Sequence, residues 1–159
     1  SEVSFCGTWG DPLMAKDIEP IVHYIMDSSR ANVLITTNGS IRTEKFYWDL
    51  GVYCGRRLSM VIDVDGINEE MHTKYRRGTS LKKSLDALQS LASTKAIPLS
   101  QSIIFKHNED YKDQITELAL SHGSHNHQHC YSDRFDGNNE WHFVNEKGQK
   151  EFLEKSTHV

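Results

Sequence analysis

Polar residues that could bind a ligand follow apolar segments of the chain at four places. These are Gly10-Asp11-Pro12, Thr37-Asn38-Gly39, Asp63-Val64-Asp65-Gly66 and Lys106-His107-Asn108-Glu109. A carboxylate accepts charge-assisted hydrogen bonds, and an amide side chain both donates and accepts. Each set taken singly is also ordinary turn chemistry, because glycine, proline, asparagine and aspartate favour turns. Together they predict a polar pocket if the fold brings all four to one side.

A histidine-rich stretch is a second candidate site. His125, His127 and His129 alternate with other residues, and Cys130 follows directly. On a β-strand the three imidazoles would share one face, and imidazole and thiolate are good zinc ligands. Side chains in strict alternation spread along a strand, whereas a metal site needs convergent ligands with supporting partners. A solvated polar strand therefore stays open as the alternative, and we assign no metal ligand.

The elements that must position these residues alternate between short apolar runs and amphipathic runs. We expect strands at 3–6, 32–36, 58–62, 102–105 and 127–131. We expect helices capped by Asp17, by Thr43 and by Thr79 or Ser80, and a further helix over 110–122. This alternation predicts an α/β fold with a mostly parallel sheet. Five strands are too few for a closed eight-stranded barrel, so we expect a partial (βα) barrel with its ligand beyond the carboxyl ends of the strands.

Composition and length favour one compact, soluble domain. The 159 residues are 37% hydrophobic and 25% charged, and the formal net charge is −4. That charge predicts no general attraction to nucleic acid or to an anionic membrane, and no apolar run approaches the roughly 18 residues that span a bilayer. We expect the core to occupy residues 1–137, followed by a polar C-terminal tail over 138–159 with a short helix near Gln149–Lys155. Three widely spaced cysteines are not a disulfide framework, which favours a reducing, cytoplasmic setting.

The order of the strand-end motifs resembles a known family. Trp9-Gly10-Asp11-Pro12, Thr37-Asn38-Gly39 and Asp63-Val64-Asp65-Gly66 resemble, in that order, motifs of the radical S-adenosylmethionine (SAM) enzyme core. The run from Asp65 to Arg76, the segment from Ile104 to Glu109, and Asp133-Arg134-Phe135 extend the resemblance over roughly residues 3–135. The last two look like a subgroup met in phage and marine microbial sequences.

The resemblance implies SAM as a cofactor and assigns roles within its pocket. Gly10 and Asp11 would meet the methionyl ammonium group, and Thr37 and Asn38 would line the same pocket. Asp63 would contact ribose hydroxyls or the methionyl end. Asn108 would reach the adenosine side from the next strand.

The same resemblance implies a [4Fe–4S] cluster, held on a Cys-x3-Cys-x2-Cys loop after the first strand of the family. That spacing does not occur here, and Cys6, Cys54 and Cys130 are too far apart in sequence to replace it. We therefore expect the first strand and the cluster loop to be missing, so that this chain alone is inactive.

Three functional hypotheses stay open. In a longer form, the protein would cleave SAM to a 5′-deoxyadenosyl radical that acts on a substrate the sequence does not identify. A reductant such as flavodoxin or ferredoxin would supply the electron. Alternatively, the chain is a SAM-binding or nucleoside-binding module without a cluster, or a metal-binding protein that uses its histidines. The catalytic residues are not assigned.

Overall fold

Five parallel strands form the main sheet. The structure is a computed structural model that describes residues 1–7, 10–145 and 147–158. The strands lie in sequence order, β1-β2-β3-β4-β5. Their bounds are Glu2–Phe5 (β1), Asn32–Thr37 (β2), Leu58–Asp63 (β3), Ile97–Ile104 (β4) and His127–Tyr131 (β5). The expected α/β partial barrel is confirmed, although β4 begins at Ile97 and not near residue 102.

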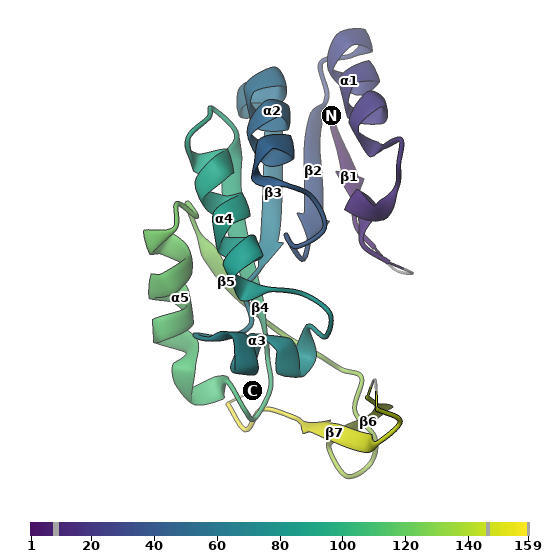
Figure 1. The fold of residues 1–159 in the computed structure, drawn as a ribbon, viewed down its shortest axis with the longest axis vertical. Coiled ribbons are helices and arrows are strands. Elements are labelled where there is room, and N and C mark those ends of the chain that lie inside the picture. The colour runs from purple at the N-terminus through teal and green to yellow at the C-terminus, as the bar shows by residue number, and fades with distance from the viewer. Residues whose placement is uncertain (8–9, 146, 159) are drawn as a thin grey trace.

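Helices cover one face of this sheet (Figure 1). They are α1 (Ile18–Ser28), α2 (Glu44–Cys54), α4 (Leu81–Ala92) and α5 (Lys112–Ser121). The short helix α3 (Glu69–Tyr75) lies between β3 and α4, at the carboxyl end of the strands. Short 3-10 turns occupy Pro12–Met14, Gly55–Arg57 and Glu109–Tyr111. A parallel sheet in strict sequence order, with helices on one side, is the arrangement of an open barrel.

The alternation of side chains along the strands places the core between the sheet and the helices. Val33 pairs with Leu58 and Ile35 with Met60, and all four are fully buried against the helices. Their neighbours along the chain point to the other face, where Leu34, Ser59 and Val61 are only partly buried. Asp63 and Gln101 follow on that second face at the carboxyl end. The second face is thus the concave side of the open barrel, which carries apolar residues along the strands and becomes polar at their carboxyl end.

The helix starts follow the predicted caps with one exception. The Thr43 hydroxyl accepts the N–H of Phe46, and the Ser80 hydroxyl accepts the N–H of Lys83. Such caps satisfy backbone donors that have no partner within the helix. Asp17 precedes α1 as expected, but its side chain makes no capping hydrogen bond.

The C-terminal segment forms an antiparallel hairpin, so the helix predicted near Gln149–Lys155 is wrong. Strands β6 (Glu140–Val144) and β7 (Lys150–Glu154) pair so that Trp141 lies opposite Leu153. Leu153 is only 2% exposed, whereas the other four residues of β7 are exposed, so Leu153 is the residue of this strand that packs inward. Whether this segment is a unit separate from residues 1–137 stays a prediction.

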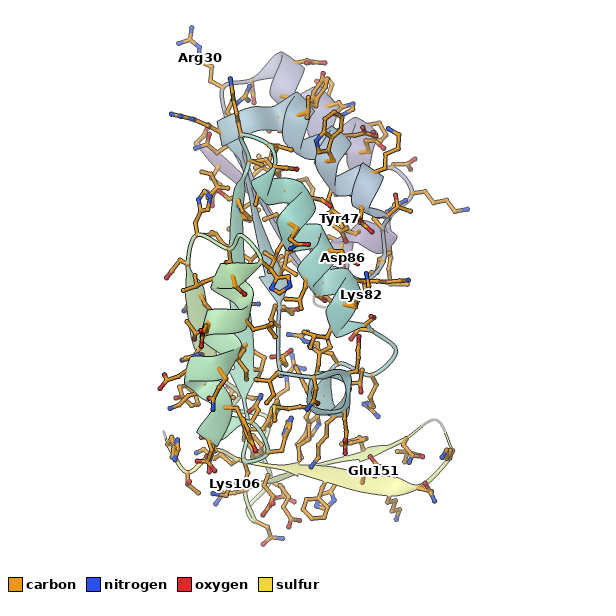
Figure 2. The ribbon with its side chains drawn as sticks, turned by 60° about the vertical axis from the view of Figure 1, so that its left-hand side comes forward. Arg30, Tyr47, Lys82, Asp86, Lys106 and Glu151 are labelled. Atoms are coloured by element: carbon orange, nitrogen blue, oxygen red, sulfur yellow. The ribbon has the colours of Figure 1, made fainter. Side chains whose placement is uncertain are left out.

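The hairpin lies at the carboxyl end of the sheet (Figure 1). Phe105 forms a β-bridge with Lys155, and the N–H of Lys106 donates to the carbonyl of Glu154. Side chains from the hairpin and the core meet at this end, with Lys106 and Glu151 at the end of the molecule opposite Arg30 (Figure 2). No helix in the described part of the chain is long and apolar enough to cross a membrane.

Candidate site at the carboxyl end of the sheet

The first two motifs contact each other directly. The carboxylate of Asp11 accepts the N–H of Leu13 at 2.9 Å, which fixes the turn after β1. It also accepts the hydroxyl of Thr37 at 2.8 Å and the backbone N–H of Asn38 at 2.7 Å, from the loop after β2. Thr37 is buried, whereas Gly10 is exposed beside this contact. Gly10, Asp11, Thr37 and Asn38 therefore lie together, as the strand-end argument predicts.

Gly39 completes the second motif for a steric reason. Its backbone has a φ of +77°, a conformation that residues with a side chain rarely adopt. A Cβ at this position would meet Ile62 Cγ2 at 2.8 Å and Ser84 Cα at 3.0 Å. The carbonyl of Gly39 accepts the hydroxyl of buried Tyr47 at 2.9 Å. The turn after β2 therefore packs tightly onto α4 and α2 and leaves no room for a side chain.

In the third motif, two carboxylates contact the same guanidinium group. Arg76, which ends α3, contacts Asp63 at 2.9 Å through Nη2 and Asp65 at 2.6 Å through Nε. Asp63 is 4% exposed and also accepts the side-chain amide of Gln101 at 2.8 Å. The sequence assigns no role to Arg76 beyond ending the run that resembles the family, whereas the structure places it between two buried acids. In the sequence, the only indication of this contact is that two acids lie eleven and thirteen residues before Arg76. Only the fold shows that both acids converge on its guanidinium.

Burial dominates the electrostatics of this cluster. Desolvation raises the pKa of Asp63 to about 7, and the charge of Arg76 opposes that rise. Burial would lower the pKa of Arg76, but the charges of Asp65 and Asp63 outweigh burial and raise it. A proton can therefore be held at Asp63 near neutral pH, while Arg76 stays charged.

His72 supports the loop that carries these acids. It is fully buried, and its Nδ1 accepts the backbone N–H of Asp65 at 3.1 Å. Its Nε2 lies 3.1 Å from the hydroxyl of Thr79, so the neutral imidazole carries its proton on Nε2. Burial lowers the pKa of His72, which favours this neutral form.

Asn108 stabilises the same carboxyl edge of the sheet through hydrogen bonds in the interior. It is fully buried, and its amide nitrogen donates to the carbonyls of Asp65 and Ile103, both at 3.0 Å. Its amide oxygen accepts the N–H of Phe105 at 2.8 Å. The side chain thus links the ends of β3 and β4. The proposed adenosine contact of Asn108 remains a prediction, and it would require replacing one of these bonds.

An open cleft lies beside the three motifs. It has a volume of about 480 Å³ and is bounded by the loop after β2, the end of α3 and the hairpin. The lining residues are Asn38, Tyr75, Arg76, Arg77, Thr79, Trp141, Val144 and Asn145. Trp141, Val144 and Asn145 come from the segment that the sequence treats as a polar tail. No local motif marks them as pocket residues, because only the hairpin brings them to this edge.

The histidine stretch does not form a metal site within the residues that the structure describes. His127 Nδ1 and Nε2 each lie 2.7 Å from a serine hydroxyl, of Ser100 and Ser102 respectively. His129 bonds to Thr116 instead, and His125 is exposed and precedes β5. Burial, followed by the charge of His129, lowers the pKa of His127 to about 4. His127 is therefore a neutral group within a serine-rich part of the interior.

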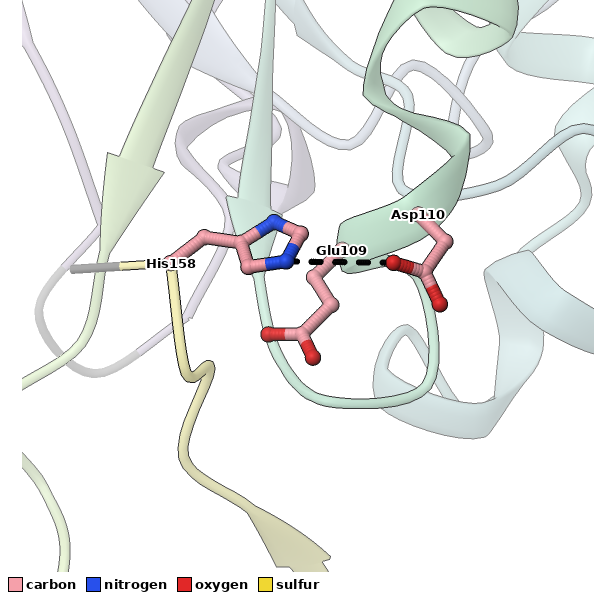
Figure 3. A group of neighbouring side chains, drawn as sticks. All are labelled: Glu109, Asp110 and His158. Carbon is pink, nitrogen blue, oxygen red and sulfur yellow. Dashed lines mark ion pairs between the residues drawn. The ribbon is translucent and has the colours of Figure 1, made fainter.

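Two acidic residues and a histidine form a second candidate metal site, which involves the end of the chain. Its buried carboxylate already has hydrogen-bond partners within the protein. Glu109, Asp110 and His158 lie close together (Figure 3). The buried carboxylate of Glu109, however, pairs with Lys106 and accepts hydrogen bonds from the Ser156 hydroxyl at 2.7 Å and the Thr157 N–H at 2.6 Å. These partners lower the pKa of Glu109 to about 2, against the effect of burial. The carboxylate ties the C-terminal segment to the core and is not free to bind a metal ion.

The cysteines do not fit a [4Fe–4S] cluster. All three are free: Cys6 is exposed after β1, Cys54 is buried at the end of α2, and Cys130 is half-buried in β5. A cluster needs thiolates that converge on one place. Cys6 lies towards the carboxyl end of the sheet, whereas Cys54 precedes β3 at the amino end. No chemical step can be assigned to a cluster on these residues.

Comparison with solved structures identifies the fold. The chain is similar to SuiB from Streptococcus suis, with a TM-score of 0.71 and 12% identity over 86% of this chain and 30% of SuiB. SuiB bound to S-adenosylmethionine gives a TM-score of 0.71 and 12% identity over 86% of this chain and 31% of SuiB. Native anSMEcpe with bound AdoMet and Cp18Cys peptide gives a TM-score of 0.60 and 13% identity, over 91% of this chain and 41% of anSMEcpe.

No protein-family model and no curated protein matches the sequence. The fold is nevertheless that of the radical SAM core, as the ordered motifs predict. The chain spans about a third of the length of these structural neighbours.

Proposed function

We propose that this chain is the SAM-binding part of a radical SAM enzyme. The observation that supports the proposal most directly is the contact of Asp11 with Thr37 and Asn38, because it joins the first two motifs at the edge where such folds bind ligands. Asp63 lies at the carboxyl end of the next strand, on the concave face. Neighbours of the same fold were solved with SAM bound, which supports the assignment.

Each of these residues would contribute a different contact to SAM binding. Gly10 leaves the backbone at the rim open, and Asp11 offers the charge that attracts an ammonium group. Thr37 orients that carboxylate, and the backbone N–H of Asn38 holds it in place. Asp63 would accept hydroxyl groups of the ribose. Arg76 keeps the two acids from repelling each other.

As part of a longer protein, the chain would hold SAM for reductive cleavage to methionine and a 5′-deoxyadenosyl radical. The electron would come from a reductant such as flavodoxin or ferredoxin, and the three cysteines of this chain do not hold a cluster that could relay it. The geometry of Cys6, Cys54 and Cys130 favours a second candidate for the chain by itself, which is a SAM-binding module that performs no chemistry.

Calorimetric titration of this chain with SAM tests the proposal. We expect saturable binding that Asp11→Asn weakens by at least tenfold, because the ammonium partner loses its charge. Asp17→Asn is the matched control, since that side chain makes no capping bond. Circular dichroism must show that both variants are folded. No binding of SAM to the wild-type chain, or equal binding by Asp11→Asn, would contradict the proposal.

Enzymatic activity requires a separate test on the longer protein. After reconstitution with iron and sulfide, release of 5′-deoxyadenosine from SAM is the expected result. SAM binding without that release would favour the binding module.

A further inference from the structure

The cleft beside the proposed SAM site combines a cationic group with aromatic surface. Arg76 and Arg77 come from the end of α3, and Tyr75 and Trp141 line the same space. No acidic side chain is among the described residues that line it. Its volume of about 480 Å³ falls in the range of small-molecule sites.

Arg77 is held in place without being neutralised by an acid. Its Nη1 donates to the carbonyl of Val144 at 3.2 Å, and its guanidinium lies 4.0 Å from the ring centroid of Phe143. Within residues 1–7, 10–145 and 147–158, no carboxylate forms an ion pair with it. Arg76 differs, because Asp63 and Asp65 already balance its charge. A fixed guanidinium with unused donors suits a phosphate group.

The aromatic wall is built from both the core and the hairpin. The rings of Tyr75 and Trp141 lie 5.7 Å apart in an edge contact, and Trp141 also packs near Phe105. Tyr75 and Trp141 are only half-buried, so ring surface remains for a ligand. A planar base stacks favourably on such exposed ring surface.

One amide in the cleft is available to read the edge of a base. Asn38 uses its side-chain oxygen to accept the N–H of Ser40, and its amide nitrogen donates to no described residue. The amide of Asn145 is different, because Lys147, Gln149 and Glu151 occupy it. Among the described residues, the cleft therefore offers two rings, one free amide donor and, besides the paired Arg76, one guanidinium without an acidic partner.

We propose that this cleft binds a nucleotide as the substrate, with its base against Trp141 and Tyr75 and its phosphate on Arg77. The inference rests on the proposed function, since SAM would occupy the neighbouring space around Asp11 and Asp63. The hairpin then supplies the residues that select the substrate, and the sheet supplies those that bind SAM.

Calorimetry on the full chain tests the inference with four probes. These are adenosine, AMP, CMP and inorganic phosphate, each titrated with and without saturating SAM. We expect at least one of the two monophosphates to bind at least tenfold more tightly than adenosine or phosphate. Arg77→Gln should remove that preference, and Trp141→Leu should weaken binding of the monophosphate at least fivefold. Arg30→Gln, at the opposite end of the molecule (Figure 2), should change nothing.

Each outcome separates the inference from the proposed function. SAM binding without monophosphate binding, or monophosphate binding that Arg77→Gln leaves unchanged, overturns the nucleotide inference alone. Full displacement of the monophosphate by SAM also overturns it, because the cleft would then belong to the SAM pocket. Monophosphate binding that depends on Arg77, without SAM binding, supports the cleft and contradicts the proposed function. If Trp141→Leu does not fold, Arg77→Gln decides.

Discussion

The carboxylate of Asp11 accepts the backbone N–H of Asn38 at 2.7 Å, so the first motif holds the second in place. The two residues are 27 positions apart and lie on neighbouring strand ends. Their contact gives the loops one shared geometry before any ligand arrives. Such preorganisation lowers the entropic cost of binding.

Loss of the Asp11 charge should therefore also cost stability. Asp11→Asn keeps the shape of the side chain but weakens bonds to Leu13, Thr37 and Asn38. Hydrogen bonds to a charged group contribute about 1.5–3 kcal/mol, so we expect the free energy of unfolding in urea to fall by about 1–2 kcal/mol. Asp17→Asn should leave it within about 0.5 kcal/mol, as surface substitutions usually do. An equal loss in the two variants would show that the contact is not stabilising.

Substitution of Gly39 separates the effect of tight packing from the effect of a left-handed backbone conformation. Gly39→Ala adds a Cβ that clashes with Ile62 and Ser84 in a left-handed backbone. We expect a loss of about 3 kcal/mol or more in the free energy of unfolding, combining overpacking with strain. Gly78→Ala is the control, since Gly78 has a φ of +73° with open space around its Cβ position. That change should cost about 1 kcal/mol, and similar losses would mean that packing at Gly39 does not matter.

Removal of Arg76 should leave two buried acids without a counter-charge. Breaking a buried pair by deleting one partner costs about 3–5 kcal/mol, which we expect for Arg76→Met in denaturant unfolding. Arg30→Met, at an exposed site, is the control and should cost little.

The loss in the free energy of unfolding caused by Arg76→Met should be smaller at acidic pH. Burial raises the pKa of Asp63 to about 7, above its unfolded value of about 3.9, so the folded state binds more protons between these values. Stability due to this group therefore rises as the pH falls from about 7 towards 4. The difference between variant and wild type should be smaller at pH 5 than at pH 8. A difference independent of pH would refute the proton-binding role of Asp63.

His127 predicts the opposite dependence on pH. Its pKa of about 4 lies below the unfolded value of about 6.5, so the unfolded state binds more protons between these values. Its contribution to stability is present above about pH 6.5 and is lost as the pH falls towards 4. His127→Gln can still bond to Ser100 and Ser102, so it should flatten this part of the pH profile. The exposed His125→Gln should not, and two identical profiles would exclude His127 as the cause.

The sequence predicts the sheet well because its signals are local. Strands such as β3 are continuous apolar runs, and Thr43 and Ser80 mark helix starts by hydrogen bonds within three residues. The strand-end motifs then predict which loops meet, since parallel strands share one carboxyl edge.

The parts that the sequence does not predict depend on distant partners. Lys150–Glu154 becomes a strand because Trp141 and Leu153 pair across the hairpin and the chain bridges to Phe105. The resemblance predicts a ligand contact for Asn108, but only the structure shows that its amide bonds to Asp65 and Ile103. Glu109 belongs to the fourth polar set in the sequence, but only the structure shows that Ser156 and Thr157 bond to it.

The attachment of the hairpin to Glu109 also sets an order of assembly. Domains fold as the chain emerges during synthesis, N-terminal segments first. Strands β1 to β4 and the three motifs precede residue 109, whereas β5, Trp141 and the anchoring Ser156 and Thr157 follow it. A nascent chain can thus form the barrel wall and the SAM-facing loops while the cleft still lacks one side. The site acquires its second wall only when translation has passed Thr157.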